Sequence, residues 1–421
     1  MRLYNNYKGL VFLTLAVSFF ICLLFFIDQG SNIKLGTFLL PFFLYLLYTI
    51  IKGYYKFLPD IKVVEKLFIL SIIYRVLFLI IILHLSELGI IKPFAVFDDE
   101  TYSFIADEGI PIKTNLYQSI LIYLYNFFGK NTLVGRFTNL FISSISLYPI
   151  SSILSKIIKI ERARKIVLLL FAFLPYEALW SIFEVKEVLL GFVLIIYLDF
   201  SLKVIYYEYK KRNIQYFVLN LLIILFLSII ANGIRSGMFY IMIISLIASL
   251  LAKKKKFVVA IIIFLLALVI FYLTNINEDD LNKYYLYKKW IRTQLSEASI
   301  YNWFLITEYA DIWKLPITFI AYCISPIPTP RKIILGQPFF ISIGTILKLF
   351  SIPFILFGMF KIYKLAKKIS YLIIVFIIPV IFISIWNFTN HRQGQAYIFI
   401  YFISFGLFLE DILKARKKVI G

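Results

Sequence analysis

Three consecutive acidic residues and a nearby tyrosine are the side chains best suited to chemistry in this chain. They are Asp98, Asp99, Glu100 and Tyr102, in the stretch VFDDETYSF. Neighbouring carboxylates raise one another's proton affinity, and a carboxylate of raised proton affinity can act as a general base. Carboxylate oxygens can also help to hold a divalent cation. The stretch therefore predicts proton transfer or cation binding, with a solvated acidic loop as the alternative.

A short helix is expected to carry these acids. Pro93 precedes the stretch, and Gly109 with Pro111 predicts its end. The acids fall in the first turn, where the helix dipole favours negative charge.

Helical spacing then decides which of these side chains lie together. Asp98, Tyr102 and Ile105 share one face, because residues three and four apart are neighbours on a helix. Asp98 and Tyr102 are therefore expected to point in one direction. The apolar Phe104 and Ile105 are expected to lie on the membrane surface.

Basic residues near the predicted outer ends of helices are candidates for binding an anionic group. A guanidinium at such a place needs an anionic partner, which a carboxylate, a lipid headgroup or a phosphate can supply. The candidates are Arg136, Lys186, Arg235, Arg292, Arg331 and Arg392. For Arg235 and Arg392, anchoring to lipid headgroups or pairing with an acid inside the membrane is an equal alternative. For Lys186, the simplest interpretation is a salt-bridged turn with Glu187.

The composition indicates a membrane protein as the setting for these residues. The chain of 421 residues is 62% hydrophobic and only 16% charged, whereas about a quarter of an ordinary soluble domain is charged. The net charge of +21 lies in short basic clusters between apolar runs, so anionic lipid headgroups explain it better than nucleic acid does.

The apolar runs predict an all-α, polytopic transmembrane helical bundle of about twelve spans, with residues 1–421 as a single transmembrane domain. The expected spans are 9–27, 35–51, 67–84, 131–155, 166–183, 187–205, 214–232, 235–252, 257–273, 339–360, 370–388 and 395–412. The basic clusters between them are 52–66, 156–165, 203–212, 253–256, 361–368 and 414–418. All these clusters fall on one side if both termini are cytoplasmic, as the positive-inside rule favours.

Two of the loops on the opposite, external side are long. Residues 85–130 hold the acidic stretch and then a tyrosine-rich amphipathic stretch that ends before Gly129. Residues 274–338 form the second loop, in which the apolar segment 316–330 either dips into the membrane interface or crosses it.

Three motifs resemble membrane glycosyltransferases of the GT-C type, the superfamily of protein mannosyltransferases and aminoarabinose transferases. The Asp-Asp-x-x-Tyr run of Asp98, Asp99 and Tyr102 is similar to the acidic pair that begins a short external helix in those proteins. The segment 390–409 looks like the entry to the last helix in bacterial members. The segment 183–200 is similar to the basic–acidic pair that opens a middle helix.

The resemblance implies an inverting glycosyltransferase that uses a polyprenyl-phosphate-linked sugar outside the bacterial cytoplasmic membrane. It implies that Asp98 is the base and that Asp99 shares its proton network or helps to hold a cation. Tyr102 orients Asp98 or the sugar, and Glu100 belongs to the substrate-binding set although it is expected to face water. Arg136, Lys186, Arg235, Arg292 and Arg392 complete that set by binding the leaving phosphate.

The identity of a cofactor and of the partners stays open. Mg²⁺ or Mn²⁺ would suit oxygen ligands, but the sequence indicates no metal-ligand set. The expected partners are the lipid-linked donor, a glycan or lipid acceptor in surface glycan assembly, and membrane lipids, with no nucleic acid.

Two other functions are alternatives. A polymerase of lipid-linked repeat units would have a similar span number and a large external loop. A flippase or transporter of lipid-linked oligosaccharides would place charges in the middle of its spans, where this chain has few: Arg75, Glu177 and Asp199.

Overall fold

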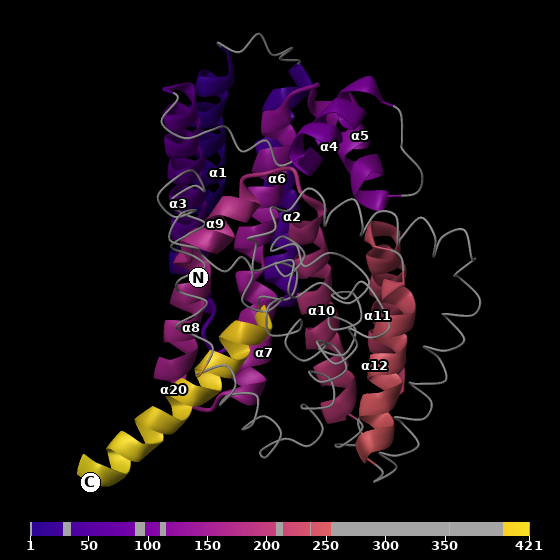
Figure 1. Cartoon of the computed structure of the whole chain (residues 1–421). Helices are drawn as coiled ribbons and strands as arrows, with labels where there is room; N and C mark the ends of the chain where they lie inside the picture. Colours follow the sequence, from indigo (N-terminus) through magenta and orange to yellow (C-terminus); the bar gives the residue numbers. More distant parts are fainter. Residues whose placement is uncertain are drawn as a thin grey trace, which may run out of the picture.

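The computed structural model describes residues 2–27, 35–88, 97–109, 115–207, 214–235, 237–253, 353 and 399–420. In the described part of the chain every regular element is a helix (Figure 1). The helices are α1 (Arg2–Ile27), η1 (Leu35–Leu39), α2 (Leu40–Tyr54), α3 (Ile61–Glu87), α4 (Phe97–Glu108), α5 (Leu116–Phe128), α6 (Thr132–Ile145), α7 (Leu147–Ile157), α8 (Glu161–Phe173), α9 (Pro175–Ser181), α10 (Lys186–Tyr207), α11 (Ile214–Ile234), α12 (Met238–Lys253) and α20 (Phe399–Ile420).

Five described helical segments are long and apolar enough to cross a membrane. They are Gly36–Tyr54, Ile61–Leu85, Thr132–Ile157, Lys186–Ile205 and Ile214–Ile234. Shorter apolar segments lie at Gly9–Leu24 and Met238–Ile247. The described part of the chain is thus an all-helical bundle, consistent with an integral membrane protein, and each of these segments coincides with an expected span.

The expected span 166–183 is wrong as a single helix. Helix α8 ends at Phe173, and Pro175 opens the short helix α9. Proline has no amide hydrogen to donate to the preceding turn, so it is tolerated at the start of a helix and not in its interior. The expected spans 257–273, 339–360 and 370–388 lie outside the described residues.

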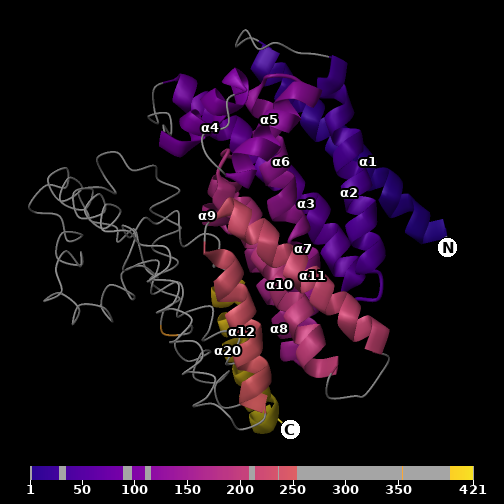
Figure 2. The ribbon, with the colours of Figure 1, turned by 90° about the vertical axis from the view of Figure 1, so that its right-hand side faces the viewer.

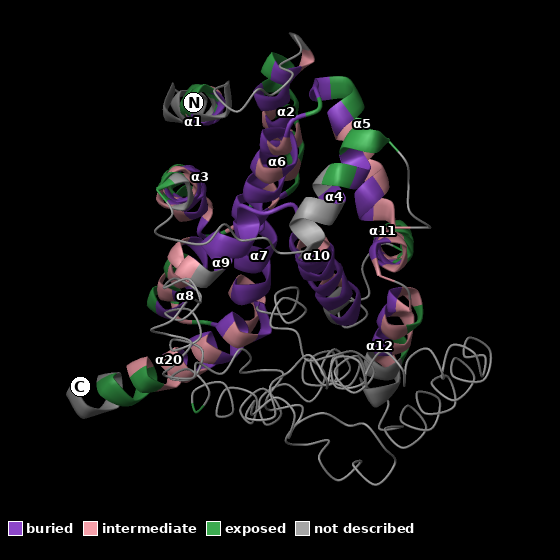
Figure 3. Cartoon of the chain, turned by 45° about the horizontal axis from the view of Figure 1, so that its top comes forward, coloured by how far each residue is buried: buried purple, intermediate pink, exposed green. Residues whose placement is uncertain are grey.

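Helices α6, α7 and α10 form the centre of the bundle. Of the most apolar stretch in Thr132–Ile157 and in Lys186–Ile205, 78% is buried, against 33% in Gly36–Tyr54 and in Ile214–Ile234. Figure 3 shows this difference as nearly continuous burial along α6, α7 and α10, whereas α11 exposes one side. The exposed side of α11 carries apolar residues such as Leu222 and Phe226, as a surface that faces lipid would.

The two ends of the bundle differ in what they carry. Helices α4 and α5 lie together at the end drawn at the top of Figures 1 and 2, and the ends of α7, α8, α10 and α12 that carry basic clusters lie towards the opposite end. We call the latter the charged end and define it by Lys52, Asp60, Glu65, Lys156, Arg164, Asp199 and Lys203. The separation is the one that the expected alternation of basic and acidic loops requires.

Asp199 on α10 is the centre of the charged end. Its carboxylate is fully buried, pairs with the ammonium of Lys203 at 2.6 Å and of Lys156, and accepts a hydrogen bond from Tyr55 at 3.2 Å. Burial, and then the adjacent Asp199, raise the pKa of Tyr55 well above its usual value, so the tyrosine keeps its proton and donates it. Asp199 therefore joins α7, α10 and the end of α2.

Two more ion pairs close the charged end. Lys52 on α2 pairs with Glu65 on α3 at 2.5 Å, and both side chains are almost fully buried. Arg164 on α8 pairs with Asp60, just before α3, at 2.7 Å. The buried charges that define the charged end thus pair with one another. Such pairing is needed because a buried charge without a partner costs several kcal/mol.

Candidate functional site

The acidic stretch lies on a helix, as its sequence predicts. Helix α4 covers Phe97–Glu108, and Gly109 follows it with φ 72°, a left-handed conformation that favours glycine. Asp98, Asp99 and Glu100 occupy its first turn, and their side chains lie outside the described part.

The buried face of α4 is partly the expected one. Tyr102 is 5% exposed and Ile105 is 3% exposed, which confirms that the two share a face. The expectation that Ile105 lies on the membrane surface with Phe104 is wrong for Ile105: only Phe104, at 66% exposure, faces outward. Helix α5 packs against α4, and Tyr102, on the same face of α4 as Ile105, contacts Tyr117 of α5.

Helix α5 is the amphipathic, tyrosine-rich stretch expected before Gly129. The side chain of Asn115 accepts a hydrogen bond from the amide of Tyr117 at 3.1 Å and so caps its start. Tyr117 and Tyr125 are buried, whereas Tyr123 is 75% exposed. The helix therefore presents one tyrosine face to the bundle.

A set of polar contacts joins α4 and α5 to the bundle. We call it the tyrosine end and define it by Tyr102, Asn115, Tyr117, Tyr125, Asn139 and Glu184. The rings of Tyr102 and Tyr117 meet edge to face, 5.4 Å between centroids at 71°. Asn115 donates to the hydroxyl of Tyr102 at 3.5 Å, and Asn139 on α6 donates to the hydroxyl of Tyr117 at 2.9 Å. These contacts fix the helix that carries the acids.

Glu184 is the buried acid of this end. It lies in residues 183–185, the turn between α9 and α10 that we call the elbow, and it is fully buried. The hydroxyl of Tyr125 donates a hydrogen bond to Oε1 of Glu184 at 2.8 Å. A buried carboxylate of this kind needs such a donor, because its desolvation is otherwise uncompensated.

Three of the predicted cations lie at the same end of the bundle as α4. Arg136 is half-buried on the first turns of α6, with its guanidinium 5.8 Å from the centroid of the Phe183 ring. Lys186 is the first residue of α10 and is half-buried. Arg235 follows α11, which contacts α5, and its buried Nη1 has no hydrogen-bond partner within the described part of the chain.

The remaining predicted site residues are not tested. Arg292, Arg331 and Arg392 lie outside the described residues, as do the second external loop, 274–338, and its segment 316–330. The described residues hold no group of three or more histidine, cysteine, aspartate or glutamate side chains that could hold a metal ion. The use of Mg²⁺ or Mn²⁺ stays a prediction.

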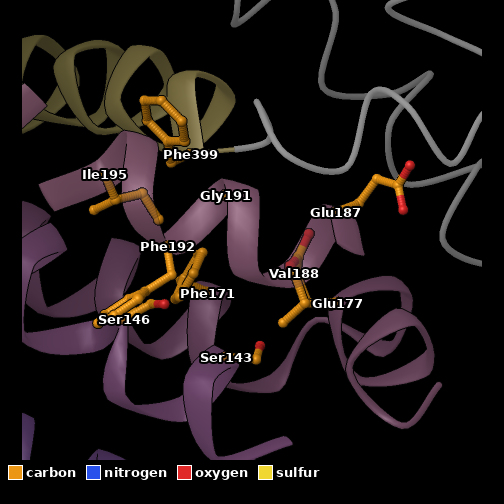
Figure 4. A pocket seen from close by; sticks show the side chains of 10 residues that line it. All are labelled: Ser143, Ser146, Phe171, Glu177, Glu187, Val188, Gly191, Phe192, Ile195 and Phe399. Atoms are coloured by element: carbon orange, nitrogen blue, oxygen red, sulfur yellow. The ribbon is translucent and has the colours of Figure 1, made fainter. Parts of the chain in front are cut away.

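A small cavity of the bundle has two acidic residues, Glu177 and Glu187, in its lining (Figure 4). Its volume is about 30 Å³, room for about two water molecules. In Figure 4, Glu177 on α9 lies on the right with Glu187 and Val188 on α10, whereas Ser146, Phe192, Ile195 and Phe399 lie on the left. Glu177 is 4% exposed and Glu187 1%, so both acids are buried.

Arg75, in the middle of α3, lies next to this cavity. Its guanidinium donates to the carbonyl oxygen of Ala172 at 2.8 Å, to the Ser143 hydroxyl at 3.2 Å and to Ser71. Arg75 is fully buried. Its position confirms that one of the three charged residues expected within spans lies mid-helix, while Asp199 lies near an end.

Sequence patterns indicated neither the elbow nor the cavity. The acids of the run FEVKE, Glu184 and Glu187, are three residues apart and directly precede an apolar run, which is the available signal. The interpretation of Lys186 with Glu187 as a salt-bridged turn stays a prediction, and the Glu187 side chain is buried. For Asn139, the surrounding sequence of 132–145 contains no pattern that indicates a functional or structural role.

Comparison of the chain with protein-family models, with curated proteins and with solved structures gives no match. The class that the described helices support is that of an all-helical membrane protein. The likeness to GT-C glycosyltransferases therefore rests on the short motifs alone.

Proposed function

We propose that this protein is an inverting glycosyltransferase that uses a polyprenyl-phosphate-linked sugar on the extracytoplasmic face of the bacterial cytoplasmic membrane. The observation that supports this most is that the helix with the acidic residues and three of the candidate cations lie at one end of the bundle. The helix with Asp98 and Asp99 packs on α5, which contacts α6 and α11. Arg136 lies early in α6, Lys186 begins α10, and Arg235 follows α11. Transfer from a lipid phosphate needs both kinds of residue, a base and cations for the leaving phosphate.

The proposed step moves one proton and exchanges one bond. Asp98 takes the proton from an acceptor hydroxyl, whose oxygen forms the new bond to the anomeric carbon. The bond from that carbon to the phosphate oxygen breaks, and polyprenyl phosphate leaves with the electron pair. Base and leaving group lie on opposite faces of the sugar, which inverts the configuration.

The cations and Asp99 have separate roles in this proposal. Arg136, Lys186 and Arg235 stabilise the negative charge that develops on the phosphate. Arg292 and Arg392 belong to the same proposed set. Asp99 supports the proton network of Asp98 or helps to hold Mg²⁺ or Mn²⁺, while Glu100 and Tyr102 contact the substrate.

The membrane orientation is part of the proposal. Cytoplasmic termini put the charged end inside and the tyrosine end outside, in agreement with the positive-inside rule. The acceptor is then a surface glycan or a lipid of the cell envelope.

The test is Asp98→Asn in a strain that otherwise lacks the gene. We expect loss of the surface sugar at an unchanged amount of folded protein in the membrane. The matched control is Asp107→Asn, on the same helix, whose side chain is 56% exposed and lies 3.8 Å from Lys130. A surface glycan equal in both variants would refute the assignment.

Two rival functions have their own readouts. A polymerase of lipid-linked repeats would leave single repeat units when Asp98 is changed, whereas a transferase leaves a glycan that lacks one sugar. The buried Arg75 and the cavity with Glu177 and Glu187 favour a carrier of lipid-linked sugars, because transporters place ionisable groups inside their spans. Loss of translocation of a labelled lipid-linked sugar in Glu177→Gln would support the carrier.

A further inference from the structure

Two residues of α6, Asn139 and Gly135, fix the position of the elbow. The Nδ2 of Asn139 lies 2.6 Å from the carbonyl oxygen of Phe183 and 3.2 Å from that of Val185, and it shares its two hydrogens between these oxygens and the Tyr117 hydroxyl. Asn139 so holds the residues on both sides of Glu184. Gly135, one turn earlier, lies against the Glu184 carboxylate: a Cβ there would come within 1.9 Å of Oε1. The Glu184 carboxylate therefore occupies the space that a side chain at position 135 would need, and an alanine there would require Glu184 to move.

The elbow and Asn139 together hold α5. Tyr125 donates to Glu184 at 2.8 Å, and Tyr117 accepts from Asn139 at 2.9 Å. The two tyrosines are each 2% exposed, and their spacing of eight residues puts them on one face of the helix. A hydrogen bond to a buried carboxylate is among the strong ones, so α5 is fixed at two points along its length.

Helix α4 is carried in turn by α5. The ring of Tyr102 packs on that of Tyr117, and the hydroxyl of Tyr102 accepts a hydrogen bond from Asn115, the cap of α5. A continuous series of contacts therefore runs from the elbow to the helix of Asp98.

The same elbow also carries two of the cations. Its first residue, Phe183, lies under the guanidinium of Arg136, and its last residue is followed directly by Lys186. We propose that Glu184 and Asn139 are positioning residues, which hold the acids of α4 at a fixed distance from Arg136 and Lys186. The proposal rests on the proposed function for its consequence in sugar transfer, but the anchoring can be measured without it.

The test is Tyr125→Phe, which removes only the hydroxyl that Glu184 accepts from. Amide hydrogen exchange of the full-length chain in lipid nanodiscs is measured over 97–128. We expect at least about tenfold faster exchange there than in the natural protein, since the lost hydrogen bond is to a buried carboxyl group. The matched control is Tyr123→Phe on the same helix, where the side chain is 75% exposed and the exchange should not change.

A second set of variants separates positioning from simple loss of stability. Glu184→Gln keeps an oxygen that can accept from Tyr125, so it should retain protection of 97–128 and most of the surface glycan. Glu184→Leu should lose both. The affinity for polyprenyl phosphate, used as the probe, should stay within about twofold in Tyr125→Phe while glycan per folded molecule falls about tenfold, because the cations stay on the bundle.

The outcomes distinguish the two proposals. Equal exchange in Tyr125→Phe and Tyr123→Phe overturns the anchoring, whether or not the protein transfers sugar. Faster exchange in Tyr125→Phe with a glycan that does not depend on Asp98 upholds the anchoring and refutes the transferase. Faster exchange with a normal glycan in Tyr125→Phe and a glycan that depends on Asp98 overturns the positioning role.

Discussion

The charged end and the tyrosine end hold the same bundle together with different chemistry. At the charged end, acids and bases meet directly, as in the buried group of Asp199, Lys156 and Lys203. At the tyrosine end, the carboxylate of Glu184 is met by a tyrosine hydroxyl, and Arg136 and Lys186 are half-buried. A charge that already has a buried ionic partner has little left to offer a ligand. At the tyrosine end, the buried Nη1 of Arg235 has no hydrogen-bond partner within the described part of the chain, so this end has a cation that can still bind an anion.

The sharpest way to break this comparison is to set Asp98→Asn against Asp199→Asn. Removal of a general base, the role proposed for Asp98, costs about 10²–10⁴-fold in rate, so the proposal predicts that glycan transfer falls about a thousandfold in Asp98→Asn with unchanged melting temperature. Transfer per folded molecule and thermal unfolding of the purified chain measure the two effects. A variant that unfolds early would mean that Asp98 is structural.

Asp199→Asn should show the reverse pattern. Lys156 and Lys203 would lose the carboxylate between them, and a buried pair broken on one side costs about 3–5 kcal/mol. We expect that loss in the free energy of unfolding by a denaturing detergent, with normal transfer by the molecules that remain folded. A transfer defect at full stability would contradict the division between the two ends.

Gly135→Ala should give an intermediate effect at the tyrosine end. The added methyl group would overlap the Glu184 carboxylate, and overpacking of this kind costs about 1–3 kcal/mol. Thermal unfolding measures the cost, and Gly53→Ala is the control, because nothing lies within 4 Å of a Cβ at that position. Equal melting temperatures for the two variants would mean that Glu184 moves away freely.

Arg235→Gln should weaken anion binding with little effect on stability. Its buried Nη1 has no hydrogen-bond partner among the described residues, so a phosphate can supply one. A charge-assisted hydrogen bond contributes about 1.5–3 kcal/mol, which predicts at least about tenfold weaker binding of polyprenyl phosphate to the purified chain. Arg162→Gln, an exposed arginine near the charged end, is the control and should bind normally.

The smallest effect is expected from Glu161→Gln on the surface of the charged end. Glu161 pairs with Lys165 one turn away, and the two side chains are 60% and 44% exposed. The hydrogen bond from Lys165 lowers the pKa of Glu161, so whatever stability the pair contributes is present above the usual pKa of glutamate and is lost as the pH falls through the lowered value. Because solvent screens the pair, the melting temperature should not change measurably.

The local signals of the sequence predicted more than its long-range contacts. The ends of α4 and α5 follow from Gly109 and Gly129, because caps act on neighbouring residues. The face of Ile105 was predicted wrongly, since spacing gives relative directions on a helix and not what packs against it. Pro175 signals the break between α8 and α9, but the apolar run 166–183 is long enough for a span and therefore predicted one continuous helix.

The elbow shows what one sequence does not contain. Glu184 is joined to Tyr125 and lies against Gly135, which are 59 and 49 positions earlier in the chain. Nothing in the spacing of these residues links them, because their meeting depends on how α5, α6 and α10 pack. Arg136 was identified as a candidate from its charge and predicted position, but its contact with Phe183 could not be predicted from the sequence.

The break between α8 and α9 has a consequence for how the protein enters the membrane. The 13 residues of α8 extend only about 20 Å, less than the roughly 30 Å of a bilayer's hydrocarbon core. Inserted alone, α8 would leave its terminal carbonyl groups in lipid, and α3 would bring a bare guanidinium there. The hydrogen bond from Arg75 to the Ala172 carbonyl compensates both groups at once, because the guanidinium lies at the negative end of the α8 dipole. Insertion of α3 and of α8 is therefore coupled, and a nascent chain that ends between them has to keep Arg75 in contact with the translocation machinery or water until α8 arrives.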